Sequence, residues 1–337
     1  MLPGDALSGT QPRGALLPVC DHYSGVEARM RKSLQLQAEM RQEFGSCVFD
    51  VTLDCEDGAP VGGEGDHAAL VVALALLADD QARVAVRVHP VGHAAFEQDV
   101  AVIAGKAGTK LRHVMLPKVE SVADVEKACA ALDAAGAMHL PLHALIESPA
   151  AVHRAFDIAA HPRVQSLSFG LMDFVSAHGG AIGWSAMGVG AESPGSPDRG
   201  QFTHPLVVRA KLEIASACHA TGKVPSHCVV TEFRDSQVVR EAARRAAREF
   251  GYTRMWSIHP DQIRPILEAF APAAQEIEVA TEIIAAAVRA DWAPVSHGGK
   301  LQDRASYRYF WQVLERAHQT GQTLAPEALG WFTVEHH

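Results

Sequence analysis

The sequence predicts an α/β fold, a (β/α)8 TIM barrel followed by a C-terminal helical appendage. Short apolar segments alternate with longer amphipathic segments along most of the chain. Each short segment is a near-continuous apolar run, as expected for strands that are covered on both faces. Eight such pairs occupy about 260 residues, the usual size of this barrel. A doubly wound open sheet is the alternative, but the first apolar segment is not followed by G-x-G-x-x-G.

The expected strands are the apolar runs at 15–19, 47–53, 83–88, 113–116, 142–146, 166–169, 223–230 and 255–258. The expected helices between them are the amphipathic stretches at 26–44, 67–78, 122–135, 150–160, 206–220 and 236–250. Ser121 with Asp124 three residues later has the pattern of a capping box, and Asp235 is a candidate N-cap.

Two segments depart from this alternation. Residues 176–205 contain seven glycines and no helical period, which favours a long functional loop, interpreted here as a mobile lid. After residue 272 the eight units are complete, so the predicted domains are a barrel at 1–272 and a C-terminal segment at 273–337. The latter has helices expected at 273–290 and 306–317. Its apolar face predicts a lid or an oligomerisation segment that covers a neighbouring subunit.

The composition excludes several classes of protein. In this chain of 337 residues, 48% hydrophobic and 20% charged residues exclude disorder as the main state. The net charge is 30 − 39 = −9, which argues against a nucleic-acid partner. The longest apolar run, 68–78, is too short to span a membrane, and no signal-peptide pattern begins the chain, so a cytoplasmic protein is expected. Six cysteines lack any C-x-x-C pair, which is typical of reduced core residues rather than a zinc site.

Polar residues follow the expected strands where a TIM barrel carries its active site, at the C-terminal ends. They are Asp54, Glu56 and Asp57 after the second strand, Arg87 at the third, Lys118 after the fourth, Glu147 after the fifth and Asp173 after the sixth.

Glu147 and Asp173 are 26 residues apart (173 − 147), about one βα unit, so they should follow adjacent strands. Two carboxylates without a nearby cysteine suit Mg²⁺, or alternatively Mn²⁺. The alternative is that each caps a helix. Arg87 could bind a carboxylate or polarise a carbonyl, or it could form a structural ion pair with the acids after the second strand. Lys118 could form a Schiff base, or it could be an ion-paired lysine.

Taken together, the strand-end motifs resemble the citrate lyase beta-subunit-like proteins of the HpcH/HpaI aldolase/citrate lyase family. Residues 53–60 (LDCEDGAP) are similar to its L-D-L-E-D-A-V-x-P, and 86–89 (VRVH) to its V-R-I-N. Residues 116–121 (LPKVES), 145–148 (LIES), 169–173 (FGLMD) and 258–263 (IHPDQI) resemble L-P-K-V-E-S, L-I-E-T, F-G-x-E-D and I-H-P-x-Q-I. The six motifs occur in the family's order, and the resemblance covers about residues 15 to 318.

The resemblance implies a Mg²⁺-dependent carbon–carbon lyase that acts on a 2-hydroxy acid, often as a CoA thioester such as citramalyl-, malyl- or citryl-CoA. It implies that Glu147 and Asp173 hold the metal, and that Arg87 and Glu147 contact the substrate. Asp303 lies where related lyases supply an acid from a neighbouring subunit; its alternative role is a helix N-cap. Glu56 or Asp57 is the reserve candidate for proton transfer. A homo-oligomer, trimer or hexamer, is expected, with a small-molecule substrate.

The sequence departs from the family at several positions. The first strand usually continues into F-V-P-G-x-R-P, whereas residues 17–24 here read LPVCDHYS. His89 replaces an asparagine, and Met172 replaces a glutamate. Two other functions therefore stay open: a class II aldolase acting on a free 2-oxo acid without CoA, and a non-catalytic accessory protein that binds a metal and a 2-oxo acid.

Overall fold

The computed structural model describes residues 2–7, 16–189 and 199–332, which form two compact units. One unit is Gly14–Ala269, and the other joins Met1–Arg13 to Phe270–His337. The predicted division at residue 272 did not anticipate that the N-terminal residues group with the C-terminal segment.

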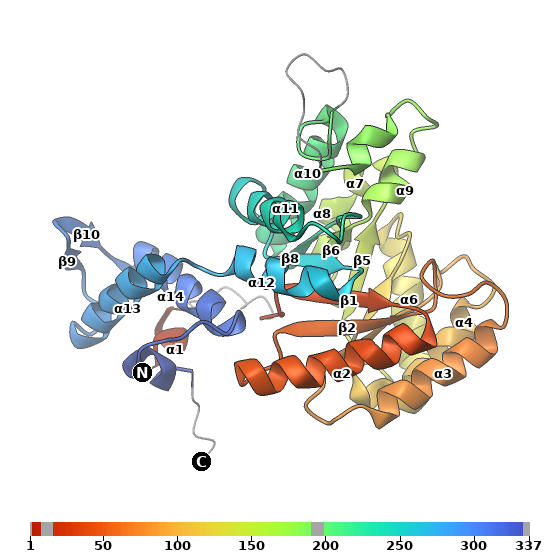
Figure 1. Ribbon diagram of the computed structural model, residues 1–337, viewed down its shortest axis with the longest axis horizontal. Coiled ribbons are helices and arrows are strands. Elements are labelled where there is room, and N and C mark those ends of the chain that lie inside the picture. The colour runs from red at the N-terminus through yellow and green to blue at the C-terminus, as the bar shows by residue number, and fades with distance from the viewer. Residues whose placement is uncertain (1, 8–15, 190–198, 333–337) are drawn as a thin grey trace. The chain divides into compact units, whose positions relative to one another are not determined.

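The larger unit is a closed barrel of eight parallel strands, so the predicted (β/α)8 fold is confirmed (Figure 1). Consecutive strands pair with each other, and the last pairs with the first through Cys20 opposite Met255. The strands are β1 (Cys20–Ser24), β2 (Phe49–Asp54), β3 (Val84–Arg87), β4 (Leu111–Leu116), β5 (Leu142–Ile146), β6 (Val164–Phe169), β7 (Val224–His227) and β8 (Arg254–Ser257).

Helices follow the strands and surround the barrel (Figure 1). The α-helices are α2 (Glu27–Phe44), α3 (Glu64–Leu77), α4 (Phe96–Asp99), α5 (Gly105–Ala107), α6 (Val122–Ala134), α7 (Pro149–His153), α8 (Ala155–Ala160), α9 (Leu171–Ser176), α10 (Pro205–Thr221), α11 (Ser236–Glu249) and α12 (Ile263–Phe270). A π-helical segment, η1 (Val100–Ala104), and the 3₁₀ turns η2 (Gly108–Lys110), η3 (Trp184–Met187) and η4 (Pro260–Gln262) complete the set.

Two predicted helix starts are confirmed. The backbone N–H of Ser121 donates to the Asp124 carboxylate at 2.9 Å, which closes the predicted capping box of α6. Asp235 caps α11 by accepting from the backbone N–H of Gln237 at 2.9 Å. The predicted loop at 176–205 contains η3 among its described residues, while its centre, 190–198, lies outside them. The lid interpretation therefore stays a prediction.

The first strand was placed wrongly at 15–19; β1 is the next segment, Cys20–Ser24. Asp21 and His22 made this segment look like a loop, because buried strands of parallel sheets are normally apolar. Both side chains are nevertheless buried, because the barrel supplies partners for them. Asp21 accepts from the Thr52 hydroxyl at 2.7 Å, and His22 Nδ1 lies 3.0 Å from the Ser257 hydroxyl.

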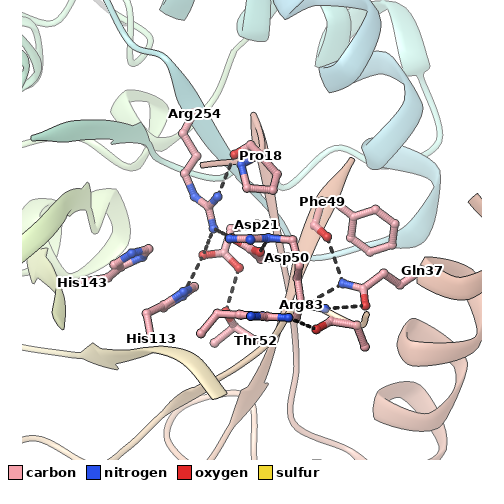
Figure 2. Close-up of polar contacts among 12 residues, drawn as sticks. Pro18, Asp21, Gln37, Phe49, Asp50, Thr52, Arg83, His113, His143 and Arg254 are labelled. Carbon is pink, nitrogen blue, oxygen red and sulfur yellow. Dashed lines mark hydrogen bonds and ion pairs between the residues drawn. The ribbon is translucent and has the colours of Figure 1, made fainter. Parts of the chain in front are cut away.

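A charged network fills the N-terminal half of the barrel (Figure 2). The guanidinium of Arg254 lies 2.8 Å from Asp21 Oδ2 and 2.6 Å from Asp50 Oδ2, and it donates to the carbonyl of Pro18 at 2.6 Å. Arg83 donates to the other oxygen of Asp50 at 2.5 Å. Burial opposes the ionisation of Asp21, but Arg254, His113 and Thr52 outweigh it and hold the pKa of this carboxyl well below its ordinary range. The two acids are thus balanced by two arginines.

An apolar layer lies above this network, toward the C-terminal ends of the strands. It is built from residues two positions beyond the polar ones on the same strands, namely Tyr23, Met115, Leu145 and Trp256. Because alternate residues of a strand face the same side, each strand presents a polar and then an apolar side chain to the barrel interior. Glu147 lies two residues beyond Leu145 and therefore opens the next layer.

The smaller unit has a core of its own. It consists of α1 (Pro3–Leu7), α13 (Ala274–Arg289), the hairpin of β9 (Val295–His297) and β10 (Lys300–Gln302), α14 (Arg304–Gln319) and α15 (Pro326–Gly330). Ile283 and Ile284 of α13 pack in one cluster with Tyr307 and Trp311 of α14 and with Leu7. Most of the apolar face of α13 is thus covered within this unit, contrary to the expectation that it needs a neighbouring subunit. Among the described residues, no helix has both the length and the apolar composition needed to cross a membrane.

Arg254→Met should lower the free energy of unfolding of the barrel by about 3–5 kcal/mol, because it leaves Asp21 and Asp50 buried without their shared cation. Arg31→Met is the matched control, since Arg31 forms an exposed pair with Glu27 on α2 and should cost less than about 1 kcal/mol. Urea unfolding followed by circular dichroism measures both. Equal costs for the two variants would contradict the structural role given to Arg254.

Candidate active site at the barrel mouth

The structure brings the polar residues predicted at the strand ends to one rim of the barrel. Asp54 ends β2 and Arg87 ends β3, and these residues are paired neighbours in the ladder. Glu147 directly follows β5, and Asp173 lies in the first turn of α9, just after β6. These are the C-terminal ends of four strands, where the βα-loops of a TIM barrel build the active site.

Arg87 is held by two acids. Its Nε donates to Asp54 Oδ1 at 2.7 Å and its Nη2 donates to Asp54 Oδ2 at 2.5 Å, a bidentate pair. Its Nη1 lies 3.1 Å from Glu56 Oε2, and its guanidinium lies 5.5 Å from the centre of the Tyr23 ring. Burial opposes the ionisation of Asp54, but Arg87 and the N–H groups of Glu56 and Gly58 outweigh it and lower its pKa. The ion pair considered as an alternative for Arg87 therefore exists, and it fixes the guanidinium at the rim.

Close backbone packing shapes this part of the rim. A Cβ atom on Gly58 would lie 2.3 Å from Asp54 Oδ2, whose place is set by the N–H of Gly58 at 2.8 Å. A Cβ atom on Gly25, after β1, would lie 2.3 Å from the backbone of Gly58. Glycine is thus required at both positions for the loops after β1 and β2 to meet.

Lys118 joins two carboxylates. Its Nζ forms an ion pair with Glu56 and lies 3.5 Å from Asp57 Oδ2, while its backbone N–H donates to Glu147 Oε2 at 3.2 Å. Its φ is +52°, a left-handed conformation that is uncommon for a residue other than glycine. Burial opposes its charge, but Glu56 above all, with Asp57 and Asp173, outweighs it and raises its pKa. A lysine that stays protonated is a poor Schiff-base nucleophile, so the ion-paired alternative holds.

Glu147 is a buried carboxyl group that no cationic side chain in the described ranges contacts directly, although Arg87 and Lys118 act on it electrostatically. Burial, together with the charges of Asp173 and Glu56, raises its pKa to about 8. In the described parts of the chain, no arginine or lysine side chain lies within 4.0 Å of its carboxylate. Gly170 leaves the room for it, because a Cβ atom there would lie 2.4 Å from Glu147 Cγ.

The remaining predicted residues differ in their surroundings. Asp173 is partly exposed and acts electrostatically on both Glu147 and Lys118. The side chain of Asp57 is 59% exposed, whereas that of Glu56 is 5% exposed. Asp303 belongs to the smaller unit, where it caps α14 by accepting from the N–H groups of Ala305 and Ser306 at 2.9 and 3.3 Å. The N-cap alternative for Asp303 is thus observed, and a role in the site remains a prediction.

A cavity of about 710 Å³ opens beside Arg87. Its lining includes Asp54, Asp57 and Arg87 from the rim, but not Glu147 or Asp173. Two basic residues of α2, Arg29 and Lys32, also line it, and so do the ring pairs Tyr23–Trp256 and Phe233–His259, each stacked with 4.6 Å between ring centres.

The sequence analysis did not identify the residues of β1 and β8 that line the cavity. Tyr23, His22 and Trp256 come from β1 and β8, and β1 was placed five residues too early. The one available signal was the basic pair at positions 29 and 32, whose spacing puts both side chains on one face of a helix.

A second set of candidate metal ligands lies deeper in the barrel. Asp21, His113 and His143 each offer a ligand atom, and these atoms lie within 4.8 Å of one another. The two imidazole rings are stacked, with centres 3.5 Å apart and planes 11° apart, so their in-plane lone pairs do not converge on one point (Figure 2). The Arg254 guanidinium, 2.8 Å from Asp21 Oδ2, adds a positive charge there. Magnesium, which prefers oxygen ligands, fits the rim acids better than this group.

Comparisons with known proteins agree on one family. A family model described as HpcH/HpaI aldolase/citrate lyase matches residues 35–260. An L-malyl-CoA/beta-methylmalyl-CoA lyase of Cereibacter sphaeroides is 29% identical over 285 residues, covering 79% of this chain and 86% of the relative. The crystal structure of a citrate lyase from Burkholderia xenovorans LB400 is 48% identical, covers 99% of both chains and has a TM-score of 0.78. The structure of CitE from Mycobacterium tuberculosis in complex with magnesium, acetoacetate and coenzyme A is 22% identical, covers 89% of this chain and 98% of its own, and shares the fold with a TM-score of 0.65.

Glu147→Gln should stabilise the metal-free protein at alkaline pH. The folded pKa of about 8 lies above the ordinary value of 4.5, so the folded state holds a proton that the unfolded state has lost, and stability falls as the pH rises from 4.5 to 8. A glutamine does not ionise, so the variant does not lose stability in this pH range and should melt at least about 2 °C higher than the parent at pH 8.5.

Melting in the presence of EDTA at pH 5 and pH 8.5 measures this effect. The melting difference between variant and parent should be more positive at pH 8.5 than at pH 5. A difference that does not change with pH would contradict the raised pKa.

Proposed function

Because the chain belongs to the HpcH/HpaI aldolase/citrate lyase family, whose model matches more than half of its length, we propose a magnesium-dependent carbon–carbon bond cleavage for it. The family resemblance and the lyase class predicted from the strand-end motifs are confirmed. The proposed substrate is a 2-hydroxy acid carried as a CoA thioester, and the products are a 2-oxo acid and a shorter thioester. The observation that carries the proposal is the buried carboxyl of Glu147 at the barrel mouth, which follows the strand beside that of Asp173 and is influenced by the Asp173 charge.

The residues present at the rim fit Mg²⁺. Glu147 and Asp173 offer hard oxygen ligands, and the repulsion between their charges would be relieved by a divalent cation. Magnesium usually keeps several water or substrate ligands besides one or two carboxylates, which matches a pair of acids at the same rim of the barrel as the cavity. When bound, it would act as a Lewis acid toward the oxygens of a 2-hydroxy acid. Mn²⁺ prefers similar ligands.

Side chains of the barrel supply the other functions of the cleavage. A base removes the proton of the hydroxyl group, the adjacent carbon–carbon bond breaks, and its electron pair leaves as the enolate of the thioester, which an acid then protonates. The hydroxyl carbon becomes the carbonyl of the 2-oxo acid. Arg87, fixed by Asp54 and lining the cavity, is placed to stabilise the substrate carboxylate or the developing enolate.

Among the barrel residues, Asp57 is favoured over Glu56 for the proton transfer. Both oxygens of Glu56 are engaged by cations, Arg87 on one and Lys118 on the other, and its side chain is almost fully buried. Asp57 is largely exposed and lines the cavity. Asp303 from a neighbouring subunit is the other candidate, as the family resemblance implies.

The cavity beside Arg87 favours a thioester over a free acid. Its stacked rings offer apolar surface for a long acyl carrier, and Arg29 and Lys32 offer positive charge for phosphate groups. A free 2-hydroxy or 2-oxo acid would use only the region near Arg87. The name of one relative supports this choice, since the Cereibacter enzyme is named for malyl-CoA.

The deciding experiment incubates the protein with Mg²⁺ and a panel of hydroxyacyl-CoA thioesters and free hydroxy acids, and measures the released 2-oxo acid. Release from thioesters alone supports the proposal; release from free acids alone indicates a class II aldolase. Binding of a 2-oxo acid without any release indicates a non-catalytic protein.

Glu147→Gln and Asp173→Asn should each weaken Mg²⁺ binding at least about tenfold, because each removes one of two charged ligands. Titration calorimetry at pH 8.5 measures this, with Asp157→Asn on α8 as a control that should bind normally. Unchanged affinity in both site variants would refute this metal site.

Arg29→Ala combined with Lys32→Ala should raise KM for a thioester substrate about tenfold, since each lost charge on a phosphate costs up to about 1 kcal/mol at an exposed site. The value of kcat should stay within about twofold, because neither residue touches the reacting atoms. Arg31→Ala, on the same helix but paired with Glu27, is the control. A fall in kcat at unchanged KM would contradict the assignment.

Arg87→Ala and Asp303→Ala should each be inactive, and a mixture should recover activity if each site takes its arginine from one subunit and its acid from another. Random assortment then restores about one site in four. Refolding the two variants together and measuring turnover tests this. Activity that stays at the background of the single variants would place both residues of a site in one chain, whereas an active Asp303→Ala variant would remove Asp303 from the site.

A further inference from the structure

We infer that Lys118 is a specificity-determining residue of the rim, which holds Glu56 away from Glu147 and so keeps the metal site at two carboxylates. The inference rests on the proposed function, because it concerns the ligands of that same site. The contacts of Lys118 carry it. Lys118 binds the Glu147 carboxylate through its backbone N–H, at 3.2 Å, and it binds the Glu56 carboxylate through its side chain.

A third acid, Glu56, lies near the two candidate metal ligands. Glu56 and Asp173 both lie close enough for their charges to act on the carboxyl of Glu147. Glu56 is also almost fully buried at the rim, so it has little access to water as an alternative partner. Without cationic partners, the carboxylate of Glu56 would be attracted electrostatically to a divalent cation bound by Glu147 and Asp173.

The structure prevents this by engaging both oxygens of Glu56. Oε2 lies 3.1 Å from Arg87 Nη1, and Oε1 is paired with Lys118 Nζ. Arg87 is itself fixed by its bidentate pair with Asp54, so it cannot follow Glu56 if that side chain turns. Lys118 is therefore the group whose removal would release one oxygen of Glu56.

The backbone conformation of Lys118 is what allows this residue to contact both Glu147 and Glu56. A non-glycine residue with a φ of +52° is strained, and such strain persists only where the surroundings enforce it. The left-handed conformation aims the N–H at Glu147 while the side chain reaches Glu56 across the rim. A glycine would satisfy the backbone better but would leave Glu56 without this cation.

The number of carboxylates decides which metal a site prefers. Mg²⁺ binds through one or two carboxylates and keeps water or substrate in its other positions, whereas Ca²⁺ accepts six to eight oxygen ligands in flexible geometry. A third carboxylate would favour Ca²⁺ and would occupy a position needed by the substrate. Lys118 thus keeps the site selective for Mg²⁺ and open to a 2-hydroxy acid.

The test is a cycle of Lys118→Gly, Glu56→Gln and the double variant, with Lys118→Arg as the charge-keeping control. Glycine adopts the observed φ without strain, so Lys118→Gly should fold and keep its N–H on Glu147; circular dichroism and melting check this. Titration calorimetry with MgCl₂ alone and CaCl₂ alone, at one pH and ionic strength, gives the ratio of the two affinities for each protein.

In Lys118→Gly, the affinity for Ca²⁺ should rise about tenfold more than that for Mg²⁺. The double variant and Lys118→Arg should both return to the parental ratio. If the affinity of Lys118→Gly rises equally for both ions, the lost charge acts without ligation by Glu56. If the affinity falls for both ions, the lysine has only a structural role. Either result overturns the inference. If the parent protein binds neither ion, or Glu147→Gln binds like the parent, the proposed metal site itself fails, which is a separate outcome.

Discussion

Charge balance inside the barrel is the constraint on which the rest of this structure depends. A (β/α)8 barrel has a dry interior, and a buried ion there must be paired or it destabilises the fold. In the N-terminal half, Arg254 and Arg83 balance Asp21 and Asp50. At the C-terminal rim, Arg87 and Lys118 balance Asp54 and Glu56. The layer of Tyr23, Met115, Leu145 and Trp256 separates the two groups.

Glu147 differs from these paired acids, because no cationic side chain among the residues that the structure describes contacts its carboxyl group. Its carboxyl is buried, it contacts the N–H of Lys118 rather than a cationic side chain, and its pKa is raised accordingly. Perturbed carboxyls of this kind gather at functional sites, because the energy that they cost the empty protein is recovered when a ligand binds. The polar network in the lower barrel, although equally rich in ionisable groups, has no such imbalance. The distinction between a structural and a functional cluster thus follows from the pairing of charges and not from the number of charged residues.

Most of the fold could be predicted from the chain alone, and so could the positions of the rim residues. Seven of the eight strands are located by their apolar runs, and the positions of Asp54, Arg87, Glu147 and Asp173 at the ends of four strands place them at one rim. The exception, β1, shows the limit of that reasoning. Asp21 and His22 are polar residues in a buried strand, and only partners more than 30 and 230 residues away, Thr52 and Ser257, make their burial acceptable.

The smaller unit illustrates the same limit. Its two helices are expected from their periodicity, but the hairpin of β9 and β10 is not among the expected elements, and neither is the packing of Leu7 against α13 and α14. The sequence by itself determined the order of the elements, the barrel class, the family and the acids at the rim, because these depend on local periodicity and short motifs. Only the tertiary structure decided which charges are neutralised, since ion pairs form between side chains that are distant in the chain. Arg87 with Asp54, Lys118 with Glu56 and Arg254 with Asp21 are such pairs, and they leave Glu147 as a buried carboxyl group that no cationic side chain in the described part of the chain contacts.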